Sequence, residues 1–252
     1  MTPIQTNGEQ PPGSRPNLTA LILCGGRGER LRPWSDAVPK SLLPVKGKPL
    51  LAYLLDHLAG TGIRDFVLCT GYKAALFEEF ASRFPGASGR LRCCDSGQVS
   101  ITERLVRARA HVAGRALVCY GDTLADVDLP ELIAAHERLG VEATLTVYPY
   151  RSPFGLVRFD EAGRVTAFAE KPSLPYWINI GFLLLETAAL QRLDANLAFS
   201  DYLAQLARHR RLGVHPHRGR HWTANTEAEF LDLASHLEPI HSPRESYAME
   251  RS

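Results

Sequence analysis

Residues 21–33 read LILCGGRGERLRP, and they join an apolar run to a loop that is rich in glycine and arginine. The apolar residues 18–24 are typical of a buried strand, and Gly25-Gly26 marks the point where a loop begins. Glycines directly after a strand let the backbone approach a phosphate and expose N–H groups to it. This segment therefore predicts a strand followed by a phosphate-binding loop.

The spacing of these glycines does not match two standard phosphate-binding motifs. A dinucleotide fingerprint that began at Gly26 would need glycine at position 31, where the chain has Leu31. A P-loop would need Gly-Lys and then Ser or Thr after four intervening residues, and that pattern does not occur. The sequence therefore argues against an NAD-dependent oxidoreductase and against a P-loop nucleotidase.

The rest of the chain alternates strand-like and helix-like segments in its first half. Strands are expected at 18–24, 66–70, 91–94 and 116–120, and helices at 50–59, 74–84, 102–112 and 129–139. The second half is expected to hold strands at 143–148, 155–159, 165–170 and 177–185, then helices at 188–193, 201–209 and 227–236. This pattern predicts an α/β, Rossmann-like fold with a mixed, mainly parallel sheet flanked by helices and a β-rich insertion.

Composition excludes several other classes of protein. The net charge of +2 gives no reason to expect nucleic-acid binding, and no apolar run reaches the roughly 18 residues of a membrane-spanning helix. The five cysteines form no Cys-x-x-Cys pair, which disfavours a structural zinc site. Their odd number, together with the lack of a signal peptide, favours a cytoplasmic location.

Polar, Pro- and Gly-rich ends suggest one folded domain between two tails. We expect a disordered tail at 1–17, a single domain at 18–237 and a flexible tail at 238–252.

A longer motif identifies a family. The pattern GGxGxRLxP at 25–33, followed by PKxLLPV at 39–45, resembles the signature of the sugar nucleotidyltransferases. These enzymes join a nucleoside triphosphate to a sugar 1-phosphate in nucleotide-sugar biosynthesis, and the resemblance extends over about 18–236. It implies that Arg30 and Lys40 are catalytic groups that neutralise phosphate charge, which suits their residue types. It also implies a division into a nucleotide-binding part, 18–140, and a sugar-phosphate-binding part, 141–237.

The same resemblance assigns a metal site. Asp122 follows the apolar residues 116–120, so its carboxylate is expected at the carboxyl edge of the sheet, where ligands bind. The family's first Mg²⁺ ligand matches Asp122, and an oxygen ligand suits that ion. Asn225 stands where many relatives have a second metal-binding aspartate. It is also a candidate N-cap for the helix expected at 227–236.

Further residues are implied to bind the two substrates. The nucleotide-binding set is Leu23, Gly25, Gly26, Gly28, Asp95, Ser96, Gly97 and Thr102. The acceptor-binding set, in and after the β-rich insertion, is Gly155, Glu170, Lys171, Asn179 and Gly181.

Within the family, the chain is most similar to the glucose-1-phosphate cytidylyltransferases, which favours CTP. It departs from them at two positions. Glu103 stands before Arg104-Leu105 where they have two glycines, and Ile180 replaces a glycine of their Asn-Gly-Gly segment. Both changes place a side chain near an expected substrate, so another nucleotide or another phosphate acceptor stays open. A catalytically silent regulatory protein is a further alternative, and a homo-oligomer is possible. The intact set of Arg30, Lys40, Asp122 and Lys171 favours an enzyme.

Overall fold

The computed structural model describes residues 17–84 and 90–237. The tails expected at 1–17 and 238–252 lie outside the described residues, except for Asn17. The Asn17 carbonyl accepts a hydrogen bond from the backbone N–H of Arg115, at 3.1 Å.

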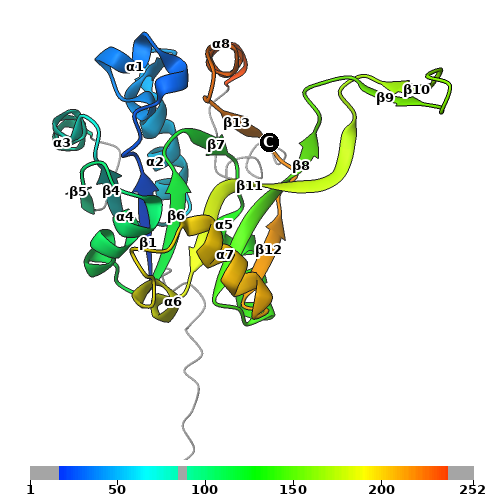
Figure 1. The fold of residues 1–252 in the computed structure, drawn as a ribbon. Helices are drawn as coiled ribbons and strands as arrows, with labels where there is room; N and C mark the ends of the chain where they lie inside the picture. The colour runs from blue at the N-terminus through cyan, green and yellow to red at the C-terminus, as the bar shows by residue number, and fades with distance from the viewer. Residues whose placement is uncertain (1–16, 85–89, 238–252) are drawn as a thin grey trace, which may run out of the picture.

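A seven-stranded sheet forms the centre of the fold (Figure 1). Its order is β12 (Leu212–Pro216), β8 (Ala143–Arg151), β11 (Ser173–Leu185), β6 (Arg115–Tyr120), β1 (Leu18–Leu23), β4 (Asp65–Thr70) and β5 (Arg90–Asp95). Only β11 runs antiparallel to its neighbours, β6 and β8. The predicted mixed, mainly parallel sheet is therefore confirmed.

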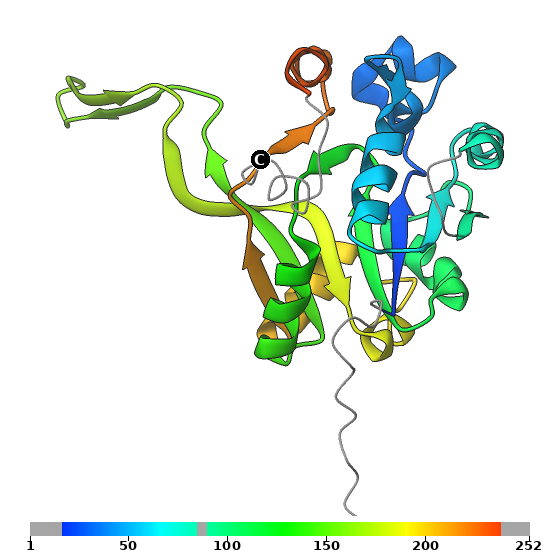
Figure 2. The same cartoon turned by 180° about the vertical axis from the view of Figure 1, so that it is seen from behind.

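Helices cover both faces of this sheet, as Figures 1 and 2 show from opposite sides. One face carries α2 (Leu50–Gly60) and α5 (Leu129–Leu139), and the other carries α4 (Ile101–Ala108), α6 (Thr187–Gln191) and α7 (Phe199–Arg208). A further helix, α3 (Ala74–Arg83), packs against β5 at the sheet edge. Helix α5 has the predicted bounds. The helix expected at 102–112 ends earlier, at Ala108, and continues as the short 3-10 helix η3 (Arg109–His111).

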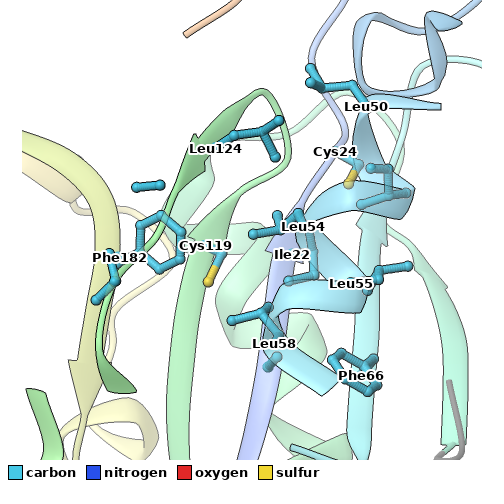
Figure 3. Packing of buried hydrophobic residues seen from close by; sticks show 14 of the residues in the cluster. Ile22, Cys24, Leu50, Leu54, Leu55, Leu58, Phe66, Cys119, Leu124 and Phe182 are labelled. Carbon is cyan, nitrogen blue, oxygen red and sulfur yellow. The ribbon is translucent and has the colours of Figure 1, made fainter. Parts of the chain in front are cut away.

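The alternation of side chains along β1 divides the core into two clusters. Ile22 points to the face that α2 covers, while Leu21 points to the opposite face. Figure 3 shows the leucines of α2, including Leu54 and Leu58, beside the buried side chains of β1, β4 and β6. Phe182 of β11 belongs to this cluster and is fully buried. Both faces of the sheet are therefore apolar, which holds its carboxyl edge in a fixed position.

Several short elements stand above that edge. They are η1 (Glu29–Leu31), α1 (Trp34–Ala37), η2 (Lys40–Leu42), β2 (Pro44–Val45), β3 (Lys48–Pro49) and α8 (Glu227–His236). A two-stranded antiparallel ladder joins β7 (Thr123–Ala125) to β13 (His221–Thr223). The sequence patterns predicted α8 but missed this ladder and β12, because strands of three to five residues carry little periodic signal.

The β-rich insertion is a hairpin of β9 (Leu156–Phe159) and β10 (Val165–Ala169), which projects from the body (Figures 1 and 2). We refer to residues 152–172, which contain this hairpin, as the arm. Its large apolar side chains are exposed, and Phe159 is 70% accessible. Strand β11 begins at Ser173 rather than at 177, because it pairs with β8 as far as Arg151.

Two other expectations concern membranes and thiols. Within the described part of the chain, no helix combines the length and the apolarity that crossing a bilayer requires. All five cysteines are free thiols, and three of them, Cys24, Cys69 and Cys119, are buried.

Replacing Phe182 with alanine tests the packing of the apolar cluster that contains it. The substitution leaves a cavity in a fully buried position, so we expect the free energy of unfolding to fall by about 3–5 kcal/mol. The matched control is Phe159→Ala in the exposed arm, for which we expect a change within about 0.5 kcal/mol. Urea unfolding followed by circular dichroism measures both values. Equal losses in the two variants would contradict this assignment of the core.

Candidate active site

Two adjoining cavities open at the carboxyl edge of the sheet, with volumes of about 800 Å³ and about 400 Å³. Both are lined by Leu23, Gly26, Arg27, Asp122 and Asn225. Ligands of open α/β sheets bind in this position because the loops after parallel strands meet there. The larger cavity is lined by the loop after β5, by α4 and by β11, and the smaller one lies against η1 and η2.

The glycine loop forms one wall of both cavities. Gly28 has a φ of 65°, a left-handed conformation that favours glycine, and it immediately precedes η1. The buried side chain of Leu31 anchors η1 to the core, which leaves Arg30 exposed beside the smaller cavity. The predicted loop of backbone N–H groups and an arginine is therefore present at this edge.

Lys40 brings together three of the predicted site residues. Its Nζ lies 2.5 Å from Asp122 Oδ2 and 2.9 Å from Asn225 Oδ1. Arg30 adds a second cation, with one guanidinium nitrogen 3.4 Å from the same Asn225 oxygen. Two cations, one carboxylate and one amide therefore meet at the floor of the smaller cavity.

The sheet and the β7–β13 ladder place Asp122 and Asn225. Gly121 lets the end of β6 approach the glycine loop, since a Cβ there would meet Cys24 Sγ and Ser41 Oγ. The pairing of β13 with β7 continues into a hydrogen bond from Ala224 N to the Asp122 carbonyl, at 3.2 Å. The two oxygen-bearing side chains thus come from adjacent backbones.

The structure resolves the cap alternatives for these residues. Thr226 is the N-cap of α8, because its side chain accepts a hydrogen bond from the Glu229 N–H, so the interpretation of Asn225 as the cap was wrong. Glu229 instead holds Asn225, whose N–H donates to Oε2 at 2.8 Å. Asp122 is followed by β7 and caps no helix, whereas the side chain of Asp128 caps α5.

The far wall of the larger cavity comes from the loop after β5. Asp95 accepts a hydrogen bond from Gly97 N at 2.9 Å, which closes a turn, and Ser96 is buried. Thr102 is fully buried below the cavity. The residues of this region that do line the cavity are Gln98, Val99, Ile101 and Arg104. Four residues predicted to bind the nucleotide therefore do not line the cavity and instead support the residues that do. They are Asp95, Ser96, Gly97 and Thr102.

Arg104 is a cavity residue that motif matching did not single out. Its side chain is only 5% exposed, and the described residues provide no carboxylate partner for it. Its guanidinium donates to the backbone carbonyls of Thr70, Gly97 and Val99. Gly25 makes room for it, because a Cβ at that position would overlap the guanidinium. Its place on the apolar face of a predicted helix is a sequence signal that could have found it, although its burial against Gly25 shows only in the folded structure.

Of two nearby charged residues, Arg27 lines the cavities and Glu103 does not. Arg27 lines both cavities and donates to Gln98 Oε1 at 2.9 Å, so it joins the glycine loop to the loop after β5. Glu103 points away from the cavity and pairs with Arg107 at 2.5 Å. The departure from the family pattern at Glu103 therefore places no side chain in the cavity.

The opposite end of the larger cavity is built by β11. Ile178, Asn179 and Ile180 line it, and Asn179 accepts a hydrogen bond from Gly181 N at 2.9 Å. Gly181 has a φ of 81° and packs against the ring of Tyr120. It therefore permits the irregularity of β11 between Asn179 and Leu183, where the pairing with β8 shifts. The departure at Ile180, unlike that at Glu103, does place a side chain at the cavity wall.

Three predicted acceptor-binding residues lie elsewhere. Gly155, Glu170 and Lys171 belong to the arm and do not line either cavity. Gly155 is in close contact with Glu170, and the Lys171 carbonyl accepts a hydrogen bond from Arg151. Their contact with an acceptor stays a prediction.

The donor set beside Lys40 fits a magnesium ion. The described residues contain no group of three or more His, Cys, Asp and Glu side chains that would hold a metal by themselves. One carboxylate and one amide oxygen, both within hydrogen-bond reach of a single nitrogen, nevertheless suit Mg²⁺, which usually takes its other ligands from waters and phosphates.

An ion pair between buried His217 and partly buried Asp126 lies next to the β7–β13 ladder. His217 Nε2 lies 3.1 Å from Asp126 Oδ1, which also accepts a hydrogen bond from the Arg220 backbone N–H. Burial lowers the pKa of His217 and raises that of Asp126, but the hydrogen bonds reverse both effects. The pKa of His217 is therefore raised above its ordinary value, and the pKa of Asp126 is lowered.

Asp126→Asn tests this pair through its pH dependence. A raised pKa of His217 contributes stability that is complete below its unfolded value of about 6.5 and is lost as the pH rises through the folded value. We expect Asp126→Asn to lower the free energy of unfolding by about 2 kcal/mol at pH 5.5. The loss should be smaller at pH 9, where His217 is neutral in both proteins. Urea unfolding at the two pH values measures the difference, and an equal loss at both would contradict the assignment.

Comparison with known proteins agrees with this geometry. The family model described as nucleotidyl transferase matches residues 19–212. A "Probable glucose-1-phosphate cytidylyltransferase" of Bacillus subtilis (strain 168) is 30% identical over 232 residues, which cover 82% of this chain and 91% of that protein. The glucose-1-phosphate cytidylyltransferase of Salmonella typhi is 31% identical over 202 residues, which cover 70% of this chain and 78% of that protein.

A guanylyltransferase and two solved structures are also similar. The mannose-1-phosphate guanylyltransferase of Mycobacterium tuberculosis is 36% identical over 190 residues and 70% of this chain, which spans about half (51%) of that protein. A structure from Bacillus anthracis has a TM-score of 0.71 at 19% identity and covers 88% of this chain and 96% of its own. HddC from Yersinia pseudotuberculosis has a TM-score of 0.69 at 19% identity, with 86% and 98% covered. The two structures show the same fold. The chain belongs to the nucleotidyl transferase family, as a sugar-1-phosphate nucleotidyltransferase.

Proposed function

We propose that this protein transfers the cytidylyl group of CTP to a sugar 1-phosphate and releases pyrophosphate. The observation that carries the proposal is the position of Lys40, whose ammonium group joins Asp122 and Asn225 beside the glycine loop. Phosphoryl and nucleotidyl transfer need positioned charge more than covalent chemistry from the protein, and this cluster supplies it.

The proposed reaction is an in-line displacement. A phosphate oxygen of the sugar 1-phosphate forms a bond to the α-phosphorus of CTP, and the bond from that phosphorus to the bridging oxygen of pyrophosphate breaks. The electron pair leaves with pyrophosphate, on which negative charge increases. Arg30 and Lys40 line the smaller cavity and stabilise that charge, while the N–H groups of the glycine loop hold the phosphates.

We propose Mg²⁺ as the metal cofactor, held by Asp122 and Asn225. When bound, Mg²⁺ would supply charge neutralisation at the phosphates. Asn225 is a neutral ligand, so this site carries one negative charge fewer than a site with two aspartates.

The division of the domain follows from the cavity walls. We propose that residues 18–140 hold the nucleotide, because they supply the glycine loop, Gln98, Val99 and Arg104. We propose that residues 141–237 hold the acceptor, because Ile178, Asn179 and Ile180 line the other end.

Arg104 and the Val99 carbonyl support cytosine as the base. Cytosine offers two acceptors, O2 and N3, and one amino donor. A buried guanidinium provides donors for the acceptors, and the second lone pair of a carbonyl such as that of Val99 provides an acceptor for the amino group. Similarity to the two cytidylyltransferases points in the same direction.

A second candidate uses the same chemistry with GTP. It is favoured by the 36% identity with the mannose-1-phosphate guanylyltransferase of Mycobacterium tuberculosis.

A nucleotide panel separates the two candidates. Pyrophosphate release is measured with Mg²⁺ and each of CTP, UTP, dTTP, GTP and ATP against glucose 1-phosphate, mannose 1-phosphate and other sugar 1-phosphates. We expect the highest kcat/KM with CTP, and a higher value with GTP would support the second candidate. No release with any pair, while a triphosphate raises the melting temperature, would indicate a binding protein without catalysis.

Replacing Lys40 or Asp122 with alanine tests the catalytic cluster. Each variant loses one preorganised charge, so we expect kcat to fall by about 10²–10³-fold. A second Lys–Asp ion pair, Lys48 with Asp56, lies outside the two cavities and provides matched controls. Lys48→Ala and Asp56→Ala should keep kcat within about twofold. Near-normal turnover in a folded Asp122→Ala protein would refute the role of Asp122.

A further inference from the structure

His221 stands at the acceptor end of the larger cavity, and neither the motifs nor the proposed reaction uses it. It belongs to β13, where side chains alternate between the two faces of the strand. His221 and Thr223 line the cavity, while Trp222 between them packs against the core. This alternation aims His221 and Asn225, four residues apart, at the same space.

The imidazole is fixed in place by its neighbours. It lies against the ring of Tyr148, with 4.9 Å between the ring centroids. Tyr148 is paired with Ile178 across the β8–β11 ladder, so His221 is held next to the strand that carries Asn179. The position of the ring is therefore set by packing, as is needed for a residue that contacts a ligand.

The two ring nitrogens of His221 differ in access. Nε2 is shut off from solvent whereas Nδ1 is not, and neither has a hydrogen bond among the residues that the structure describes. A ligand hydroxyl in the cavity can therefore reach Nδ1, where a hydrogen bond would satisfy an unpaired polar group.

The imidazole is neutral at neutral pH. Burial, followed by the nearby charge of His217, lowers the pKa of His221 to about 4 against the opposing effect of Glu229. A neutral imidazole has one N–H donor and one acceptor, which suits a hydroxyl group and does not suit binding of an anion by charge.

We propose that His221 hydrogen-bonds a hydroxyl of the acceptor sugar remote from its phosphate, and that it is a specificity-determining residue. His221 begins β13, and Asn225 follows the end of that strand, so His221 lies on the Ile178–Ile180 side of the cavity rather than at the Lys40 cluster. The proposal rests on the proposed function for the identity of the acceptor as a sugar 1-phosphate. A neutral imidazole at this position favours acceptors with a hydroxyl group at the end remote from the phosphate over acceptors with a carboxylate there.

His221→Phe tests the proposal because phenylalanine keeps the ring and removes both nitrogens. We expect KM for the sugar 1-phosphate to rise about tenfold, while KM for CTP stays within about twofold. His221→Gln, which keeps a donor and an acceptor, should recover part of the loss. The control is His111→Phe, since His111 is an exposed histidine of η3 outside the cavities.

Deoxy acceptors identify the hydroxyl. Against the wild type, the sugar 1-phosphate that lacks the contacted hydroxyl should lose about tenfold in kcat/KM, and against His221→Phe it should lose less than about twofold. Unchanged acceptor KM in a folded His221→Phe protein, or a rise confined to KM for CTP, would overturn the proposal.

A measurement without turnover keeps the two proposals separate. In protein labelled with ¹⁵N-histidine, the His221 Nδ1 resonance should shift when the acceptor preferred in the panel, or glucose 1-phosphate if none reacts, is added. Failure of the wild type to release pyrophosphate would count against the proposed function alone. An unperturbed His221 resonance at saturating sugar phosphate would overturn the role of His221 alone.

Discussion

The ammonium group of Lys40 is the point on which the site depends. It joins Asp122 and Asn225, which follow it by 82 and 185 positions in the chain, and each of the three comes from a different short element at the sheet edge. Without a cation between them, the carboxylate and the amide oxygen would present negative potential to one another and to an incoming triphosphate. The same requirement makes the cluster suitable for nucleotidyl transfer, since it concentrates positive charge where phosphate charge must be neutralised.

The rest of the fold positions this cluster. The apolar clusters on both faces of the sheet fix the ends of β1 and β6, and Gly121 allows the two loops to touch. Helix α8 holds the third segment, because Phe230 packs on Trp34 with 5.3 Å between ring centroids. Glu229 then holds the backbone of Asn225. Stability and chemistry are linked here, since loosening α8 would release a site residue.

The sequence allowed the positions of the glycine loop and of Asp122 in the fold to be predicted. A strand followed by glycines, and a second strand followed by Asp122, fix positions at the carboxyl edge through topology alone. Asn225 was harder, because its place depends on the three-residue strand β13 pairing with β7 across about a hundred positions of the chain. Arg104 was missed because its importance comes from burial against Gly25, which only the packed structure reveals.

The arm carries the part of the assignment that rests on resemblance alone. Glu170 and Lys171 were assigned to the acceptor, and they lie in the arm, which leaves the sheet where the pairing of β8 with β11 ends at Arg151 and Ser173, outside the lining of both cavities. Sequence spacing gives the number of residues between Lys171 and Asn179, but it does not show whether that segment is extended or folded back. At the acceptor end, Asn179 was among the predicted residues and lines the cavity, whereas His221 belongs to no motif and was not predicted.

The central claim is that Lys40, Asp122 and Asn225 form the centre that binds the metal and the triphosphate. A crystal structure of the protein with a non-hydrolysable CTP analogue and Mn²⁺ in place of Mg²⁺ tests it most directly, because anomalous scattering locates the metal. The account predicts one manganese peak bonded to Asp122 and Asn225, the phosphates against the glycine loop and Lys40, and the base beside Arg104. A metal or a triphosphate bound away from Asp122 and Lys40 would contradict it.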